Sequence, residues 1–257
     1  MSFISVGFSY DGVRGEDMFG LKLVRESASL IDQFFGRSRD ILKDQLKYDN
    51  RIIDYGTKDN NLEFTVYLAK ENPWTFQERT EVNRWLFKNS FRDFITDDYP
   101  LVFKIKPKNA KFSNTGGQQG IIKIDFESNA STAFSPLSSQ SFDLSSNTGT
   151  TNISITNSSN FSGKFTRYRP EMQFTLSGST SIMIENLSDG GRTFEMTGLT
   201  DGETIYVNHR TGKTIPETAI ANVENRRFLE LVYGANNLRI TGQLSDLTFR
   251  MQFPIMV

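Results

Sequence analysis

The sequence predicts a mostly β protein with two domains: an N-terminal domain of strands with one helix, followed by a C-terminal antiparallel β-sandwich. Three observations lead to this fold class. Short runs of alternating apolar residues fill residues 168–242, and Gly-rich turns separate them. Met172, Phe174 and Leu176 form one such run, and another at residues 229–233 leads into a predicted turn at residues 234–237. This period of two places one set of side chains on one face of each strand. A single helical pattern stands out in the first half, and a Ser/Asn-rich segment separates the two halves.

The first domain is expected to span residues 1–130 and to consist mainly of strands. Four of its segments have the apolar patterning of strands, at residues 21–24, 61–69, 101–106 and 121–126. In the second of these, Phe64, Val66 and Leu68 point to one face, which we expect to be buried. Residues 36–50 fit a short helix and a loop arm equally well, so the conformation of this arm stays open.

One helix is expected in the first domain. Thr75 and Glu78 have the spacing of a capping box, in which the hydroxyl and the carboxylate each satisfy a free backbone N–H. Behind them, Val82 and Trp85 fall on one stripe of a helix. The pattern therefore predicts a helix near residues 75–91.

The composition changes abruptly at the end of the first domain. Within residues 128–163, Asp143 is the only charged residue, and Ser, Thr and Asn dominate. Apolar residues still punctuate this segment, which a free linker would not need. We therefore expect an ordered connection over residues 131–150 and the second domain over residues 151–257. Whether the last strand, within residues 247–257, completes the second domain or returns to the first stays open.

Charge and composition disfavour several kinds of partner. Residues 1–127 hold 19 basic and 19 acidic side chains, and the remainder holds 10 and 11, so neither half has the basic excess of a nucleic-acid-binding surface. No stretch approaches the ~20 apolar residues of a membrane-spanning helix, and the first residues do not resemble a signal peptide. The chain has no Cys, which fits folding in a reducing cytoplasm.

Catalytic and metal-binding motifs are not evident. The single histidine, His209, falls in a predicted hairpin turn at residues 207–212, where we expect it to be exposed. A zinc site needs several His, Cys or carboxylate ligands, and no nucleophile elbow or phosphate-binding Gly-rich loop is present. We therefore predict no catalytic residue, no metal and no cofactor.

Paired carboxylates deserve separate consideration because glycoside hydrolases require only two. The candidate pairs are Asp97 with Asp98 and Asp201 with Glu203. Asp residues in turns commonly bond the local backbone, which explains these pairs better than catalysis does. A lone acidic residue such as Asp189 also cannot supply the six oxygen ligands of a calcium ion. We therefore expect a protein that is not an enzyme.

Carbohydrate binding is the alternative function that the residues leave open. Sugar-binding sandwiches use exposed aromatic side chains, and the candidate contacts for a glycan or a protein partner are Tyr99, Tyr168, Tyr206 and Tyr233. A strand tyrosine more commonly packs its ring at the edge of the core and keeps its hydroxyl in water. Both Trp residues fall in the first domain, so the second domain lacks a Trp platform.

Several segments, taken in order, resemble the siphophage distal tail protein family (Dit) across nearly the whole chain. They are the strand pair at 168–184, residues 197–207, the hairpin at 208–212, residues 228–242, Trp85-Leu86 and the acidic turn Asp97-Asp98-Tyr99-Pro100. One segment departs from the family, because Gly36-Arg-Ser-Arg-Asp40 lacks the second glycine of the corresponding loop. Because this segment lies in the arm at residues 36–50, the resemblance does not define the conformation of the arm.

The resemblance implies an N-terminal β-sandwich-type domain with one helix, which assembles into a hexameric ring, and a galectin-like C-terminal antiparallel β-sandwich. Such rings join the tail tube protein to the tail-tip hub protein or baseplate and support receptor-binding proteins, with the tape measure protein as a further partner. The expected place is the virion, at the tail tip, after assembly in the host cytoplasm. The alternative is a carbohydrate-binding module that contacts host cell-wall glycan. Fold likeness alone establishes neither role.

Overall fold

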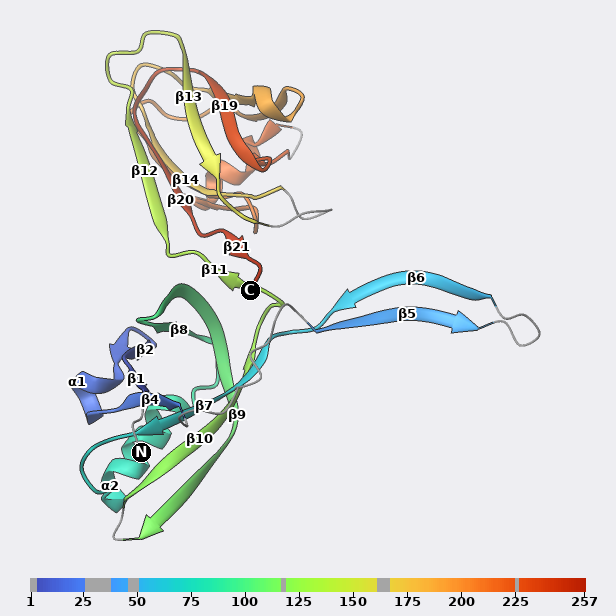
Figure 1. Cartoon of the computed structure of the whole chain (residues 1–257). Coiled ribbons are helices and arrows are strands. Elements are labelled where there is room, and N and C mark those ends of the chain that lie inside the picture. The colour runs from blue at the N-terminus through green and yellow to red at the C-terminus, as the bar shows by residue number, and fades with distance from the viewer. Residues whose placement is uncertain (1–3, 26–37, 46–50, 117–118, 161–166, 225–226) are drawn as a thin grey trace. The chain divides into compact units, whose positions relative to one another are not determined.

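The computed structural model describes residues 4–25, 38–45, 51–116, 119–160, 167–224 and 227–257 (Figure 1). The chain divides into two compact units: the first comprises Met1–Ser135 with Ile255–Val257, and the second comprises Pro136–Pro254. All paired strands run antiparallel, and the described residues form two short α-helices. The predicted mostly β fold class is therefore confirmed. The domain limits stay a prediction.

The first unit is built on one large sheet with the strand order β1-β4-β7-β10-β9-β8-β2-β3, to which β11 and β21 are added. Its strands are β1 (Ile4–Val6), β2 (Phe8–Tyr10), β3 (Val13–Arg14), β4 (Lys22–Arg25), β7 (Glu63–Ala69), β8 (Arg92–Thr96), β9 (Tyr99–Gly116), β10 (Gln119–Ser128), β11 (Ala133–Phe134) and β21 (Pro254–Ile255). A separate two-stranded sheet pairs β5 (Arg39–Gln45) with β6 (Ile52–Asp59).

All four strands predicted in this half are present, but β9 is far longer than the expected residues 101–106. It spans 18 residues and contains Pro107, which a sequence pattern marks as a strand breaker. The sheet accommodates Pro107 at a β-bulge. Phe126 pairs with Pro107 and Asp125 pairs with Asn109, so Lys108 is the extra residue of the bulge. Proline has no backbone N–H to donate to the neighbouring strand. A bulge interrupts the regular hydrogen-bond ladder, so this missing donor is tolerated there.

Aromatic side chains fill the core of the first unit. Trp85 lies 6.1 Å from Phe8 and 5.7 Å from Tyr10 between ring centroids, and Phe94 lies 5.9 Å from Phe126. The hydroxyl of Tyr10 donates a hydrogen bond of 2.9 Å to the carbonyl of Leu86. Burial and the neighbouring Asp11 carboxylate raise the pKa of Tyr10 to about 12. This core fixes α2 on the sheet.

The predicted helix is α2 (Phe76–Leu86), and the capping box is confirmed. The backbone N–H of Glu78 donates to Thr75 Oγ1 at 3.1 Å, and that of Thr75 donates to Glu78 Oε2 at 2.8 Å. The predicted helix end near residue 91 is wrong, because Phe87 already leaves the helical conformation. A second helix, α1 (Gly15–Phe19), was not expected, since five residues are too few to show a period.

Removing the Thr75 hydroxyl is expected to lower the free energy of unfolding of the first unit by about 1 kcal/mol, because the backbone N–H of Glu78 loses its side-chain acceptor at the start of the helix. Urea unfolding of Thr75→Ala followed by Trp fluorescence measures this, since both Trp residues lie in the first unit. Thr80→Ala is the matched control, because the Thr80 hydroxyl bonds only the carbonyl of Phe76 on an exposed helix face. Equal losses in the two variants would contradict a capping role.

The second unit is a sandwich of two antiparallel sheets with the strand orders β12-β20-β14-β17-β18 and β13-β19-β15-β16. The strands of the five-stranded sheet are β12 (Ser138–Asp143), β20 (Leu244–Met251), β14 (Glu171–Leu176), β17 (Thr204–Asn208) and β18 (Lys213–Ile215). The four-stranded sheet contains β13 (Thr150–Asn157), β19 (Gly234–Thr241), β15 (Ile182–Asn186) and β16 (Arg192–Met196). Two 3-10 helices, η1 (Leu187–Asp189) and η2 (Glu217–Asn222), lie between strands.

The alternating pattern predicted this sandwich well, with one error. Met172, Phe174 and Leu176 are all buried on β14, as expected. The strand predicted at residues 229–233 is wrong: only Leu231 forms an isolated bridge there. The real strand, β19, instead includes residues 234–237, which the sequence predicted as a turn.

The side chain of Asn236 explains why the turn prediction failed. Its amide accepts the N–H of Val232 at 2.8 Å and donates to the carbonyls of Val232 and Gly234 at 2.8 and 2.9 Å. The residue therefore supplies the hydrogen bonds of a turn with its side chain while its backbone belongs to a strand. Asn favours turns because its side chain forms such local hydrogen bonds. The sequence pattern therefore detected these hydrogen bonds but assigned them to a turn of the backbone.

The end of the chain resolves the question that the sequence left open. β20 pairs with β12 and β14 and completes the five-stranded sheet of the second unit. The last residues, Ile255–Val257, belong to the first unit, where β21 pairs with β11. β12 lies inside the segment predicted as a connection, so the second sandwich already begins there.

Candidate assembly surface

The arm formed by β5 and β6 is the most distinctive surface element of the first unit (Figure 1). We call residues 39–45 and 52–59 the arm. Every described residue of β5 is exposed, and so is every residue of β6 except Asp59. The two strands pair with each other and with no other described strand. Residues 36–37 and 46–50 of the predicted arm lie outside the described residues.

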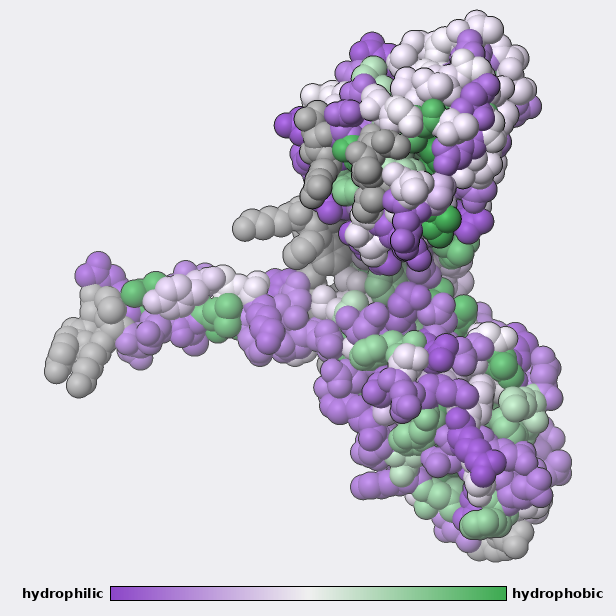
Figure 2. All heavy atoms as spheres, turned by 180° about the vertical axis from the view of Figure 1, so that it is seen from behind, coloured by the Kyte–Doolittle hydropathy of each residue, from purple (hydrophilic) through white to green (hydrophobic). Residues whose placement is uncertain are grey.

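Apolar side chains lie on both faces of the arm. The large exposed members are Ile41, Leu42, Ile52, Ile53 and Tyr55, between 39% and 63% exposed. Ile41 and Leu42 are successive residues of one strand, so they point to opposite faces. Ile52 pairs opposite Gln45, and Ile53 pairs opposite Asp44, so each face carries one isoleucine from β6 as well. Figure 2 shows hydrophobic atoms interspersed with hydrophilic ones along this ribbon.

Polar contacts fix the shape of the arm. At its base, Arg39 Nε donates to Asp59 Oδ1 at 2.9 Å. In the middle, the register shifts between Leu42 and Lys43, and Gly56 adopts a positive φ of 98°. The Asp54 carboxylate accepts the N–H of Gly56 at 2.8 Å. A bulge of this kind increases the twist of the ribbon and interrupts the regular edge that an aggregating strand would need.

The four tyrosines predicted as contacts are divided between the two units and differ in exposure. Tyr99 begins β9 in the first unit and is 50% exposed, whereas Tyr233 precedes β19 in the second unit and is 64% exposed. Tyr206 is half-buried on β17. Tyr168 is half-buried too: its hydroxyl accepts the N–H of Gln252 at 2.8 Å, and its ring lies 4.7 Å from that of Phe253. A glycan or partner contact by these residues stays a prediction.

Three carboxylates of the predicted pairs form structural contacts, two of them with residues distant in the sequence. Asp97 forms two hydrogen bonds with Arg14, at 2.8 and 3.2 Å, and the Asp201 carboxylate accepts the N–H of Gly178 at 2.6 Å. Glu203 accepts the N–H of Thr200 at 3.2 Å. Among the described residues, no group of three or more His, Asp or Glu side chains is arranged to hold a metal ion.

The prediction that His209 is exposed is wrong, because its side chain is fully buried. Its Nδ1 accepts the N–H of Leu229 at 3.2 Å, and its ring lies edge-on to Phe194 at 4.6 Å between centroids. Burial, with a smaller effect from the Arg169 charge, lowers the pKa of His209 to about 3. The histidine is therefore a neutral core residue that anchors the loop before β19.

An ion-pair cluster that the sequence did not reveal surrounds Glu230, a buried residue. Arg169 donates two hydrogen bonds to Glu230 Oε1, at 2.7 and 2.9 Å, and Arg192 approaches Oε2 at 3.1 Å. Arg167 contacts both Glu230 and Asp189, at 3.3 and 2.8 Å. Burial raises the pKa of Glu230, but the Arg169 hydrogen bond and the Arg192 and Arg169 charges outweigh it, so the pKa lies below its usual value.

No helix within the described ranges has both the length and the apolar character needed to cross a membrane. This finding concerns helices alone.

Comparisons with known proteins place the chain among phage tail proteins. Residues 3–130 match the family model described as phage tail protein N-terminal domain. A search of curated protein sequences returned no significant match. The crystal structure of SPP1 Dit, described as a paradigm of hub adsorption apparatus in phages infecting Gram-positive bacteria, aligns with a TM-score of 0.66. That alignment has 12% identity and covers 96% of this chain and 99% of that one.

Two structures of the phage p2 baseplate in its activated conformation, with Ca and with Sr, align as well. Their TM-scores are 0.56 and 0.55 at 9% and 8% identity, and the alignments cover 98% and 96% of this chain and 98% and 97% of those chains. At such low identity the likeness is one of fold. Through residues 3–130 the chain belongs to the phage tail protein N-terminal domain family, and nearly its whole length has the fold of a siphophage distal tail protein.

Proposed function

We propose that this protein is a distal tail hub subunit that self-associates through its first unit into a closed hexameric ring. The arm carries the proposal. A two-stranded ribbon alone is at best marginally stable in water, and this one exposes four large aliphatic side chains and a tyrosine. Its described residues gain little from their own fold, so a partner surface is the natural source of their stabilisation.

The distribution of apolar residues on the arm also indicates how it is covered. A ribbon that lies flat on one surface needs only one apolar face, but here Ile41 and Leu42 point to opposite faces. Such a ribbon fits a groove or a seam that encloses it. In a ring, each head-to-tail interface is equivalent, so every arm meets the same acceptor surface on the next copy.

The proposed partners follow from this role. The ring would join the tail tube protein to the tail-tip hub protein and support receptor-binding proteins, with the tape measure protein as a further contact. The SPP1 protein with the same fold is described as part of a hub adsorption apparatus, which supports this assignment. The proposed place is the tail tip of the virion, after assembly in the host cytoplasm, and the proposed role is structural and not enzymatic.

The arm variant Ile41→Asp is expected to abolish the ring, because a charge would be buried in each interface. Native mass spectrometry should show a species of six copies of the 29.3 kDa chain for the unchanged protein and monomers for the variant. Circular dichroism should be the same for both, since Ile41 is 62% exposed and packs into no core.

Ile215→Asp is the matched control, because Ile215 is 50% exposed on β18 of the second unit. Tyr55→Ser and Tyr233→Ser form a second pair, with 63% and 64% exposure. The proposal requires the arm members to disrupt assembly and the second-unit members to leave it intact. A protein that stays monomeric at high concentration even with its tail partners present, or a ring that tolerates Ile41→Asp, would refute it.

A further inference from the structure

The end strands on the two sides of the second sandwich differ in how well their edges are protected. On one side, β18 is only three residues long, Pro216 follows it directly, and η2 packs against it. On the same side, β16 is the end strand of the four-stranded sheet, and its residue Met196 forms an isolated β-bridge with Val223. The edge of β16 is therefore partly paired. Short strands, proline and covering segments are the usual protections of a sheet edge. This side of the sandwich is therefore closed.

On the other side, β12 and β13 are the end strands of the two sheets, and within the described residues no further strand pairs with their outer edges. β13 pairs with β19 over eight residues without a register shift. Asp143 is the only charged residue in either strand. The open edges thus lack both the bulges and the charges that commonly protect such strands.

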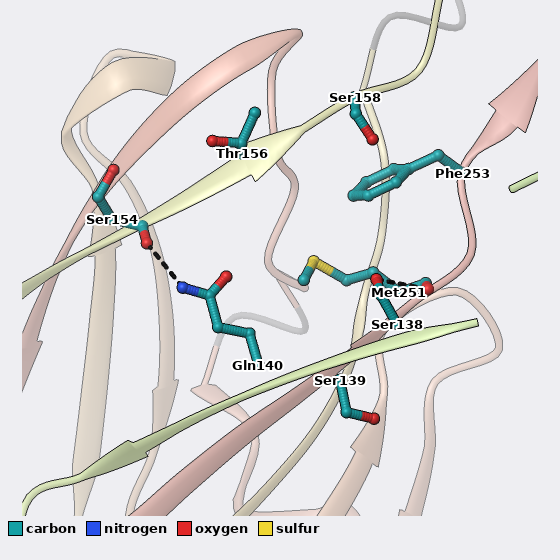
Figure 3. Close-up of a pocket in the computed structure, with 8 residues that line it drawn as sticks. All are labelled: Ser138, Ser139, Gln140, Ser154, Thr156, Ser158, Met251 and Phe253. Atoms are coloured by element: carbon teal, nitrogen blue, oxygen red, sulfur yellow. Dashed lines mark hydrogen bonds between the residues drawn. The ribbon is translucent and has the colours of Figure 1, made fainter. Parts of the chain in front are cut away.

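A groove of about 400 Å³ lies between β12 and β13 (Figure 3). This volume is near the lower end of the ~300–1,000 Å³ that small-molecule sites occupy. Hydroxyl and amide side chains line it, namely those of Ser138, Ser139, Gln140, Ser154, Thr156 and Ser158. Met251 and Phe253 complete the lining among the described residues, none of which carries a charge.

Most hydroxyls of the groove form no hydrogen bond within the described protein, whereas several other strand hydroxyls of this sandwich are paired. Ser141 bonds Thr248 at 2.9 Å and Thr175 bonds Thr204 at 3.0 Å across neighbouring strands. Within the described residues, the hydroxyls of Ser139, Ser154, Thr156 and Ser158 form no such bond. Each offers one donor and two acceptor positions to a ligand.

The position of the Gln140 side chain indicates whether the groove suits an extended peptide or a compact ligand. Its Nε2 crosses the groove and donates to the backbone carbonyl of Ser154 at 3.3 Å. A strand added along β13 would need that carbonyl for its own ladder and would meet the Gln140 side chain in its path. The open stretch beyond this crossing is bounded by Thr156, Ser158 and the Phe253 ring. It suits a compact ligand better than a continuous chain.

We propose that this groove binds a neutral sugar residue. A sugar ring carries hydroxyls around its rim and C–H groups on its faces, which match the hydroxyl walls and the Met251 and Phe253 side chains. The described part of the lining contains no Lys or Arg, which disfavours phosphorylated or acidic ligands there. Tyr168, predicted as a direct contact, would instead act as a positioning residue, since its ring packs on Phe253.

Titration of the full-length protein with maltose and with chitobiose, followed by ligand-observed NMR, tests the site. At least one should bind with a dissociation constant of about 1 mM, as expected for a small ligand held mainly by neutral hydrogen bonds. Thr156→Val should weaken binding about threefold to tenfold. The double variant Ser154→Ala with Thr156→Val should weaken it more than tenfold.

Thr204→Val is the matched control, because Thr204 is also an exposed strand threonine but lies outside the groove. It should bind sugar like the unchanged protein. No saturation by either sugar up to about 20 mM, equal loss in the control, or binding of a Ser/Thr-rich peptide in place of sugar overturns the proposal. The site does not depend on the ring: groove variants should keep the oligomer, and Ile41→Asp should keep sugar binding.

Discussion

Replacing Glu230 by alanine is expected to destabilise the second unit by about 3 kcal/mol. Removing one partner of a buried ion pair costs about 3–5 kcal/mol, because the other charge is left without compensation. Here the lower end applies, since the side chains of Arg167 and Arg169 are each 47% exposed and can regain water. Arg169 loses the most, because both of its hydrogen bonds end on Glu230.

Urea unfolding with two probes measures this effect. Both Trp residues lie in the first unit, so Trp fluorescence follows that unit, whereas far-UV circular dichroism follows both. Glu230→Ala should lower the midpoint of the dichroism transition and leave the fluorescence transition in place. Glu185→Ala is the control: Glu185 has a single, partly exposed Arg239 partner, so about 1 kcal/mol or less is expected. An unchanged dichroism midpoint in Glu230→Ala would mean that the cluster contributes nothing to stability.

Acidification from pH 7 to pH 5 is expected to cost the second unit about 2 kcal/mol through His209 alone. The pKa of His209 is about 3 in the folded protein and about 6.5 when unfolded, so the unfolded chain binds the extra proton between these values. Stability is then fully present above pH 6.5 and falls by about 1.4 kcal/mol per pH unit below it. The depressed pKa of Glu230 acts only below its unfolded value near pH 4.3, outside this window.

His209→Asn supplies the comparison, because the Asn carbonyl can replace Nδ1 as the acceptor of the Leu229 N–H and does not titrate. His209 is the only histidine, so no other side chain of ordinary pKa titrates between pH 7 and 5. Urea unfolding at both pH values should show a loss in the unchanged protein and a nearly flat profile in the variant. Equal pH dependence in the two proteins would exclude His209 as the cause.

The sequence was most informative where one local pattern sets one structure. The alternation of Met172, Phe174 and Leu176 predicted β14, because burial of one face needs nothing beyond that period. The Thr75–Glu78 capping box predicted the start of α2 for a similar reason: its hydrogen bonds join residues three apart. Such features depend on residues close together in the sequence, so they can be predicted without knowledge of the fold.

Features that depend on distant partners were missed. Glu230 is an ordinary strand-like glutamate in the sequence, and only the fold brings Arg167, Arg169 and Arg192 to it. His209 looked like a turn residue, yet the loop at Leu229, 20 residues away, covers it. The lining of the groove was missed because single serines in β12 and β13 carry no signal until two sheet edges face each other.

The path of the chain at its end makes the second unit an insertion. The polypeptide leaves the first unit after β11 and re-enters it at β21, and these two short strands are paired. Insertions are tolerated where the two ends of the inserted piece lie close together. One sheet can thus keep its own pairing while the module that it carries is enlarged, exchanged or lost. Under the proposed function, this arrangement would let the assembly surface stay constant during evolution while the second unit changes.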